Sequence, residues 1–310
     1  MKNFFVATSE TQSPLRNQPQ VLVIGNFDGV HLGHQQLLAK ACSMGARLGK
    51  PAIAVTFDPH PMQILRPPHL RLFDQKDQQQ QFEKAGLRGV VYLRFSRDFS
   101  ELSAEQFLDE ILGREFAPVG IVVGYNFRFG AGRSGDTEML KEWGRQNNCE
   151  VQVVESVEGA DGVISTSAVR KSLQAGDVEK AARLLGRPVY VSGIVVHGES
   201  RGHKLGFPTA NLHLENLTTP AWGVYATKVK FASSEYLAVS HLGPIPTFSD
   251  DLVRLEAHLL DFKGDLYGEM LRVEFIARVR GVLKFPSVDA LRAQIQSDIE
   301  RARVLLGIPK

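Results

Sequence analysis

The segment GNFDGVHLGHQQLL spans residues 25–38 and directly follows the apolar run VLVI at residues 21–24. An apolar run that ends in glycine predicts a short buried strand. The apolar residues that come next recur at helical spacing: Leu37, Leu38, Ala41, Met44 and Leu48. Gly49 and Pro51 end this helix, because glycine accepts the left-handed cap and proline cannot continue a helix. The segment therefore predicts a strand, a turn of small residues and a helix.

The first half of the chain repeats this alternation. Further apolar strand candidates are AIAVTFD (52–58), VVYL (90–93), GIVVG (120–124) and VQVVE (151–155). Helical stretches such as Ala104–Leu112 and Thr137–Gln146 lie between them. Strands that are apolar throughout and separated by helices indicate a parallel sheet covered on both faces. We expect an α/β, Rossmann-like domain over residues 20–186, after a flexible leader over residues 1–19.

The second half has a different period, with the boundary near Gly186-Arg187-Pro188. Apolar and polar residues alternate over residues 228–231, 254–259 and 271–278, which is typical of half-buried antiparallel strands. Several such strands with glycine and proline turns predict a small antiparallel β-barrel over residues 187–310. A C-terminal helix, about Ser287–Leu306 with Ser287 as its N-cap, closes the chain.

Composition limits the class of ligand. The 310 residues are enough for two domains, and the net charge is only +2. Neither half has the bulk charge of a nucleic-acid or membrane binder, so we expect small-molecule ligands and no nucleic-acid or membrane partner. Cys42 and Cys149 have no metal-type spacing, and no run resembles a secretory signal or a membrane span. We expect a cytoplasmic protein, and self-association remains open.

The turn at residues 25–31 has the features of a phosphate site. Ligands of open parallel sheets bind beyond the carboxyl ends of the strands, and a helix N-terminus attracts phosphate. His31 and His34 lie on the first helical turn and can donate to the same phosphate oxygen. Zinc is the rival ligand, but the spacing is not HExxH and no glutamate separates the histidines. The alternative for His34 is a partly buried capping residue. Neither a P-loop nor a GxGxxG turn occurs here.

Longer motifs point to a family. In the first half they are GNFDGVHLGH (25–34), TFDPHP (56–61), GYNFRFGAGRSGD (124–136) and ISTSAVR (164–170). In the second half they are VHGESRGHKLGFPTANL (196–212), GVYA (223–226), LLDFKGDLYG (259–268) and KFPSVDALRAQIQSDIERAR (284–303). Together they resemble the bacterial bifunctional riboflavin kinase/FMN adenylyltransferases, or prokaryotic FAD synthetases, over about residues 20–306. The resemblance implies a nucleotidyltransferase domain that converts FMN to FAD, releasing pyrophosphate, and a riboflavin kinase domain that forms FMN.

For adenylyl transfer, the resemblance implies that His31, His34 and Asn126 align the reacting phosphates. It also implies these ATP contacts: Gly25, Phe27, Asp28, Ser165, Thr166, Ser167 and Arg170. Asp58 and Phe129 would lie on the flavin side. From the residues alone, the three hydroxyls could equally be N-caps, Asn126 an Asx turn and Phe129 a core residue.

For the kinase reaction, the resemblance implies that Thr209 and Asn211 bind Mg²⁺ and that Glu256 is the general base. Mg²⁺ normally takes few protein ligands, so a hydroxyl and an amide suffice. The backbone at three glycines, Gly198, Gly202 and Gly206, would wrap the ATP phosphates. From the sequence alone, Glu256 could be one residue of a solvated strand face.

The chain departs from the family pattern in two places. Val163 stands where the family often has a basic residue. SHLGPIPTF (240–248), expected to be a loop near the flavin or nucleotide, stands where the family commonly has a sequence similar to ANIGTRPTF, which makes His241, Pro244 and Ile245 substitutions. Two alternatives therefore stay open at this point: a paralogue with a single activity, and a non-catalytic flavin or nucleotide sensor.

Overall fold

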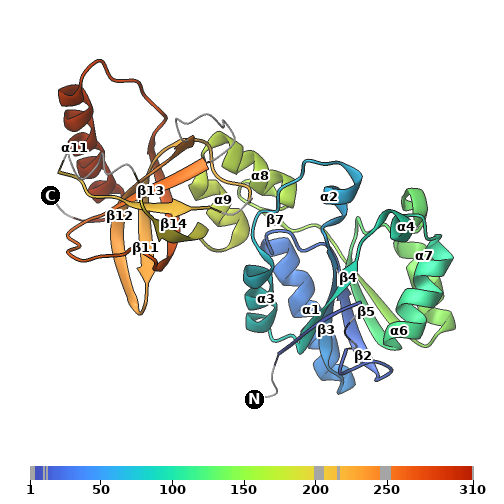
Figure 1. Ribbon diagram of the computed structural model, residues 1–310. Coiled ribbons are helices and arrows are strands. Elements are labelled where there is room, and N and C mark those ends of the chain that lie inside the picture. The colour runs from blue at the N-terminus through green and yellow to red at the C-terminus, as the bar shows by residue number, and fades with distance from the viewer. Residues whose placement is uncertain are drawn as a thin grey trace. The chain divides into compact units, whose positions relative to one another are not determined.

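The computed structural model describes residues 4–9, 11, 13–198, 206–214, 217–244 and 253–308 (Figure 1). The chain forms two compact units, Met1–Thr166 and Ser167–Lys310. Gly186, where we expected the domain boundary, is the left-handed C-cap of helix α9 (Val178–Leu185). By its contacts α9 belongs to the second unit, together with nearly all of α8 (Thr166–Ala175).

The first unit contains a six-stranded sheet in the order β1-β4-β3-β2-β5-β6, and every neighbouring pair in it is parallel. Its strands are β1 (Phe5–Thr8), β2 (Gln20–Ile24), β3 (Ala52–Asp58), β4 (Gly89–Arg94), β5 (Pro118–Gly124) and β6 (Glu150–Val154). All five residues of β2 are buried. This confirms the parallel α/β sheet predicted from continuous apolar runs.

Helices cover both faces of this sheet (Figure 1). On one face α1 (Leu32–Leu48) and α3 (Gln75–Lys84) share a buried core with Val21 and Val23 of β2. On the other face α7 (Thr137–Gln146) and the π-helix η1 (Phe107–Gly113) share a second core with Leu22 and Ile24. Successive β2 residues thus enter opposite cores, as the two-residue period of a strand requires.

Short helices and one hairpin complete the first unit. The expected helix over Ala104–Leu112 is part of a continuous helical segment, in which α5 (Ala104–Gln106) and α6 (Arg114–Phe116) flank the π-helix η1. The remaining elements are α2 (Pro61–Leu65), α4 (Arg97–Ser100), α5 (Ala104–Gln106), α6 (Arg114–Phe116), the 3₁₀-helix η2 (Ala131–Arg133), β7 (Glu158–Gly159) and β8 (Gly162–Val163).

The expectation of a flexible leader over residues 1–19 is corrected in one part. Phe5–Thr8 forms the edge strand β1, which pairs in parallel with β4. Ala7 is buried, and the ring of Phe5 lies against the backbone of Gly89, where a Cβ would approach it to 2.4 Å. The buried Ala7 and the partly buried Phe5 ring anchor this edge strand to the core.

The second unit is a closed barrel in the order β10-β13-β12-β11-β14-β9, and all its neighbouring strands are antiparallel. Its strands are β9 (Val189–Val196), β10 (Ala210–His213), β11 (Gly223–Phe231), β12 (Ser234–Pro244), β13 (Val253–Leu259) and β14 (Met270–Arg280). Helix α11 (Val288–Leu305), capped by Ser287 as predicted, packs Ile299 and Ala302 on the outside of β11. The predicted barrel with a C-terminal helix is confirmed. No helix in the described ranges is both long and apolar enough to cross a membrane.

Candidate functional site

The loop between β2 and α1 lies where the strand order reverses. From β2 the chain continues to β3 and β4 on one side of the sheet, whereas β5 and β6 lie on the other side. The crevice at such a switch point, beyond the carboxyl ends of the strands, is the usual ligand site of an open parallel sheet. His31 ends the loop after β2, and exposed Asn126 follows β5 by two residues. Both therefore lie at the edge where we expected phosphate binding.

The backbone of this loop is strained. Phe27 has φ +50°, Gly29 has φ +84° and Val30 has φ +39°. A positive φ is costly for a phenylalanine and more so for a β-branched valine, and such strain concentrates at ligand sites. The loop therefore holds an unusual shape that its surroundings must enforce.

Side chains from neighbouring helices donate hydrogen bonds to the backbone carbonyls of this loop. Gln78 of α3 donates from Nε2 to the carbonyl oxygens of Asn26 (3.1 Å) and Phe27 (3.2 Å). Tyr92 of β4 orients this amide by donating to Gln78 Oε1 at 3.0 Å. Burial raises the pKa of Tyr92 to about 12, so its hydroxyl keeps the proton that it donates. Gln35 donates to the Val30 carbonyl at 3.0 Å.

Sequence reasoning missed Gln78, which belongs to the QQQQ run at residues 78–81. The run resembles an ordinary polar stretch, and in the fold only its first residue, Gln78, is buried. The usable signal is the helical period: Gln78 and Phe82 are four residues apart and share the buried face of α3.

His31 and His34 stack on each other at the first turn of α1, with ring centroids 3.7 Å apart and planes 17° apart. His31 is the N-cap residue, and its Nδ1 accepts from the backbone N–H of His34 at 3.3 Å. A neutral imidazole that accepts at Nδ1 carries its proton on Nε2. The cap thus fixes His31 as an Nε2–H donor. Gly33 makes room for this ring, since a Cβ there would lie 3.1 Å from it.

Burial, and secondarily the adjacent His31, hold the pKa of His34 well below its ordinary value of 6.5. Its Nδ1 is buried and lacks a hydrogen-bond partner in the described part of the chain. Protonation would give that buried nitrogen an N–H with no acceptor, which is costly. His34 is therefore a neutral ring packed edge-on against Phe27, at 5.3 Å between centroids.

Acid is expected to destabilise the first unit partly through His34. The pKa of His34 in the folded chain lies below 6.5. As the pH falls below about 6.5, His34 therefore becomes protonated in the unfolded chain while it stays neutral in the folded chain. The contribution of His34 to the free energy of unfolding is thus complete above pH 6.5 and falls below it, by up to about 1.4 kcal/mol per pH unit. Urea unfolding between pH 7.5 and 5 should show a shallower acid loss for His34→Gln. A slope identical to that of the unsubstituted chain would contradict this.

Phe27 and Asp28, which we expected to contact ATP, are both buried. Phe27 is fully buried between His34 and Phe82. Asp28 Oδ1 accepts from the backbone N–H of Leu72 at 2.8 Å. A Cβ at Gly25 would come within 3.1 Å of the Phe27 ring. These residues shape the loop that presents the two histidines.

The segment Ser165-Thr166-Ser167 lies at the start of α8, as predicted. Thr166 opens the helix, and its hydroxyl donates to the Asp28 carbonyl at 3.2 Å. This bond ties the start of α8 to the histidine loop, and both partners belong to the first unit. Arg170 lies in the second unit and donates to the Thr218 hydroxyl at 2.9 Å. Val163, the departure before this motif, is exposed in β8.

The two residues predicted on the flavin side differ in exposure. The Asp58 carboxylate is about half exposed and pairs with Arg71 at 2.7 Å. Phe129 is only 6% exposed and packs between Phe107 and Phe127, with centroids 5.4 and 5.5 Å away. Phe129 thus has the surroundings of a core residue.

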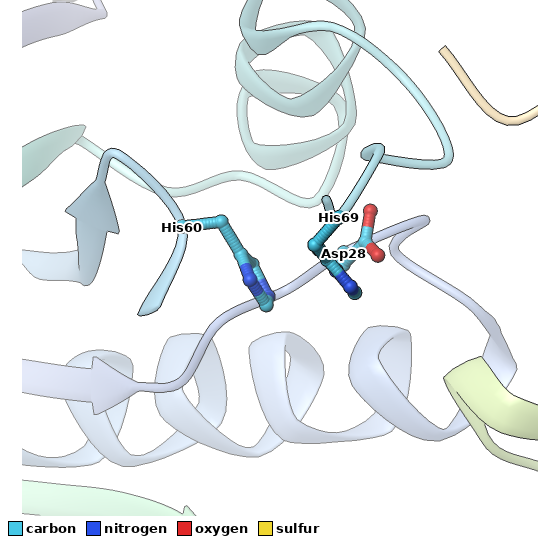
Figure 2. A group of neighbouring side chains, drawn as sticks. All are labelled: Asp28, His60 and His69. Carbon is cyan, nitrogen blue, oxygen red and sulfur yellow. The ribbon is translucent and has the colours of Figure 1, made fainter. Parts of the chain in front are cut away.

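Asp28, His60 and His69 converge beside this loop, with one ligand atom of each within 4.8 Å of the others (Figure 2). Such a set suits a borderline cation such as Zn²⁺ better than Mg²⁺. However, His60 is the N-cap of α2, and its Nδ1 accepts from the Met62 N–H at 3.1 Å. Its Nε2 must then carry a proton, which opposes metal ligation at that nitrogen. The two histidine rings stack with centroids 4.8 Å apart, and Asp28 and His60 each accept from a backbone N–H, so the cluster has a structural role in holding these loops.

In the barrel, the strand register brings the predicted kinase residues together. Asn211 of β10 and His241 of β12 pair with Glu256 of β13 from its two sides. Ser240–Pro244 extend β12, which corrects our expectation that residues 240–248 form a loop; residues 245–248, with Ile245, lie outside the described ranges. The pairing makes Glu256 the centre of a row of three polar side chains.

Asn211 is buried at the end of this row. Its Oδ1 has no hydrogen-bond partner among the described residues, whereas Nδ2 donates to the Thr209 carbonyl at 3.3 Å. Gly198 lies directly against the Asn211 amide, and a Cβ there would clash with it. Gly206 has φ +89° and is exposed, and Gly202 lies outside the described residues.

Two family models match the chain: one described as FAD synthetase over residues 13–168, and one described as riboflavin kinase over residues 185–306. Three similar proteins are each described as a bifunctional riboflavin kinase/FMN adenylyltransferase. That of Haemophilus influenzae is 36% identical and covers 92% of this chain and 94% of its own. That of Escherichia coli K12 is 36% identical, covering 94% of both. That of Pseudomonas fluorescens is 38% identical, covering 92% of both.

A solved structure agrees over nearly the whole chain. It is described as a macrolide-efflux protein from Streptococcus pneumoniae and is 33% identical to this chain. The TM-score is 0.87, and the match covers 96% of this chain and 98% of that one.

Proposed function

The chain belongs to the bifunctional riboflavin kinase/FMN adenylyltransferase family, and from that premise we propose which of its residues carry each reaction. The chain phosphorylates riboflavin to FMN with ATP, and it transfers the adenylyl group of a second ATP to FMN, giving FAD and pyrophosphate. The first reaction belongs to the barrel and the second to the parallel-sheet unit.

For adenylyl transfer, the single most informative observation is the stacked histidine pair at the mouth of α1. A phosphate oxygen of FMN attacks the α-phosphorus of ATP, and pyrophosphate leaves, so the protein must align two anions and stabilise charge on the equatorial oxygens. His31 donates Nε2–H to one such oxygen. His34 holds that ring in place by stacking, and the helix N-terminus adds its positive end. Asn126 offers an amide N–H from the end of β5.

The other predicted contacts take supporting roles in this proposal. The first N–H groups of α8 and the hydroxyls of Ser165 and Ser167 would meet further phosphate oxygens of ATP, and Arg170 remains a predicted contact to them. Asp58 remains a predicted flavin contact. The burial of Phe129 favours a packing role for that ring.

For the kinase reaction, we assign Glu256 as the general base that takes the proton from the riboflavin 5′-hydroxyl as it attacks the γ-phosphate. Mg²⁺ would be held by Asn211 Oδ1 and the Thr209 hydroxyl. The site fits such an ion, because Asn211 Oδ1 is buried without a hydrogen-bond partner among the described residues and amide oxygens are ligands that Mg²⁺ accepts. When bound, the ion neutralises charge on the ATP phosphates.

Loss of the Asn211 oxygen should weaken Mg²⁺ binding in one reaction only. We expect Asn211→Ala to raise the Mg²⁺ concentration for half-maximal riboflavin phosphorylation by about tenfold or more. Even residues that only hydrogen-bond to a metal ligand change metal affinity by about tenfold, and Asn211 is proposed as a direct ligand. Gly198→Ala should act in the same direction, because its Cβ displaces the amide. The Mg²⁺ dependence of FMN adenylylation is the internal control. An unchanged kinase Mg²⁺ curve in Asn211→Ala would refute the metal assignment.

Chromatography of products tests the functional assignment directly. The chain with riboflavin, ATP and Mg²⁺ should yield FMN and then FAD, and with FMN and ATP it should yield FAD and pyrophosphate. Product from only one of the two substrates would identify a single-activity paralogue. Flavin binding without any turnover would identify a sensor.

We place the protein in the cytoplasm, where riboflavin, FMN and ATP meet. Cys42 and Cys149 are both free thiols, which is compatible with a reducing compartment.

A further inference from the structure

We propose that His241 is a positioning residue for the riboflavin kinase reaction and that it holds the Glu256 carboxylate in its working orientation. This inference rests on the role proposed above for Glu256. It concerns a residue where the chain departs from the family pattern, which commonly has asparagine at this position.

The strand register puts the two side chains face to face. His241 of β12 is paired with Glu256 of β13, and Glu256 is paired on its other side with Asn211 of β10. Side chains directly opposite in an antiparallel pair lie on the same face of the sheet, with their Cβ atoms about 5 Å apart. The imidazole and the carboxylate therefore lie on the same face as direct neighbours across the strand pair.

Gly243 fixes where the imidazole lies. A Cβ at Gly243 would be 2.9 Å from His241 Cε1 and 3.3 Å from Nε2, so the ring lies along the strand and over this glycine. Residues 241 and 243 share one face of β12. Any side chain at residue 243 must push the ring away from its present place.

Among the charged groups around His241, Glu256 acts most strongly on it, and Arg280 is already paired. The guanidinium of Arg280 is already held by Asp298 of α11, with contacts of 2.7 to 3.0 Å, and by the Gly281 carbonyl at 2.9 Å. The pKa of His241 is lowered by burial and raised by Glu256, with smaller opposing effects of Arg280 and Asp298. The net direction is downward, and a neutral ring still has one N–H to donate to the carboxylate.

A general base must point its oxygen at the hydroxyl proton that it removes. A neighbouring N–H that hydrogen-bonds the carboxylate once substrate is bound would therefore speed the chemical step more than it strengthens substrate binding. We expect His241→Leu to lower kcat for riboflavin phosphorylation about tenfold, with KM for riboflavin and ATP changed less than about twofold. His241→Asn keeps an N–H donor and should restore kcat to within about threefold of the unsubstituted chain.

The experiment measures both reactions of the full chain in each preparation. Gly243→Ala keeps the imidazole but displaces it, and should lower kcat of the kinase reaction as His241→Leu does. Glu235→Gln is the matched control: it lies on the same face of β12, removes an exposed ion pair with Lys228, and should change neither reaction. A thermal unfolding curve that matches that of the unsubstituted chain reports that the barrel of each variant is folded, and FMN adenylylation is the control for the first unit.

The outcomes separate this inference from the function on which it rests. If Glu256→Gln abolishes riboflavin phosphorylation and His241→Leu leaves kcat unchanged, His241 is no positioning residue, while the role of Glu256 stands. If His241→Leu lowers kcat but His241→Asn does not restore it, the size of the ring matters and its N–H donor does not, and the proposal is wrong. If Glu256→Gln keeps full kinase activity, the assignment of the base itself fails.

Discussion

His31→Ala is expected to lower the rate of FMN adenylylation by about two to three orders of magnitude and to leave riboflavin phosphorylation within about twofold. The magnitude is that of removing one preorganised donor to a developing charge. The donor is preorganised, because the hydrogen bond that His31 Nδ1 accepts from the His34 N–H fixes the ring proton of His31 on Nε2 before substrate binds. Initial rates of FAD formation from FMN and ATP, and of FMN formation from riboflavin and ATP, measure the two effects in one preparation.

The control lies on the same helix. Gln36 is an exposed residue of α1, and Gln36→Ala should change neither rate. Equal loss of both reactions in His31→Ala, in a chain that still unfolds cooperatively, would contradict the assignment. A chain with both histidines replaced should lose little more than His31→Ala alone, because stacked rings that act as one unit are not additive.

The sequence predicted the parallel sheet because each strand of the first unit is apolar over its whole length. It could not predict the strand order, which places the loop after β2 and the turn after β5 at one switch point. Nor could it show which side chains hold the carbonyl of Phe27, a residue with positive φ, because Gln78 and Tyr92 are distant in sequence and look ordinary there. Long-range hydrogen bonds to loop carbonyls leave no periodic trace in the sequence.

In the barrel, too, the sequence predicted the strands but not which side chains they bring together. Alternation predicted that Glu256 lies on the polar face of its strand, and it was compatible with a merely solvated position. The register, which depends on turns and on packing between strands, decides that Asn211 and His241 are its neighbours. The short strand β1 was missed because four residues carry too little pattern to distinguish an edge strand from a loose end.

Glu256→Gln is expected to lower kcat for riboflavin phosphorylation by two to four orders of magnitude, which is the usual contribution of a general base. Glutamine keeps the size of the side chain and its place between Asn211 and His241, but it cannot take the proton of the attacking hydroxyl. KM for riboflavin and ATP should therefore change little, and FMN adenylylation should continue at its full rate. Initial rates at saturating Mg²⁺ give all three quantities.

A rival role for Glu256 makes a different prediction. If its carboxylate were an additional Mg²⁺ ligand and not the base, Glu256→Gln would raise the Mg²⁺ requirement, and high Mg²⁺ would restore the rate. If it is the base, no Mg²⁺ concentration restores the rate, because the missing step is a proton transfer. The Mg²⁺ titration of Glu256→Gln beside that of Asn211→Ala decides this, since only Asn211→Ala should recover. Recovery of both would reassign Glu256 to the metal site.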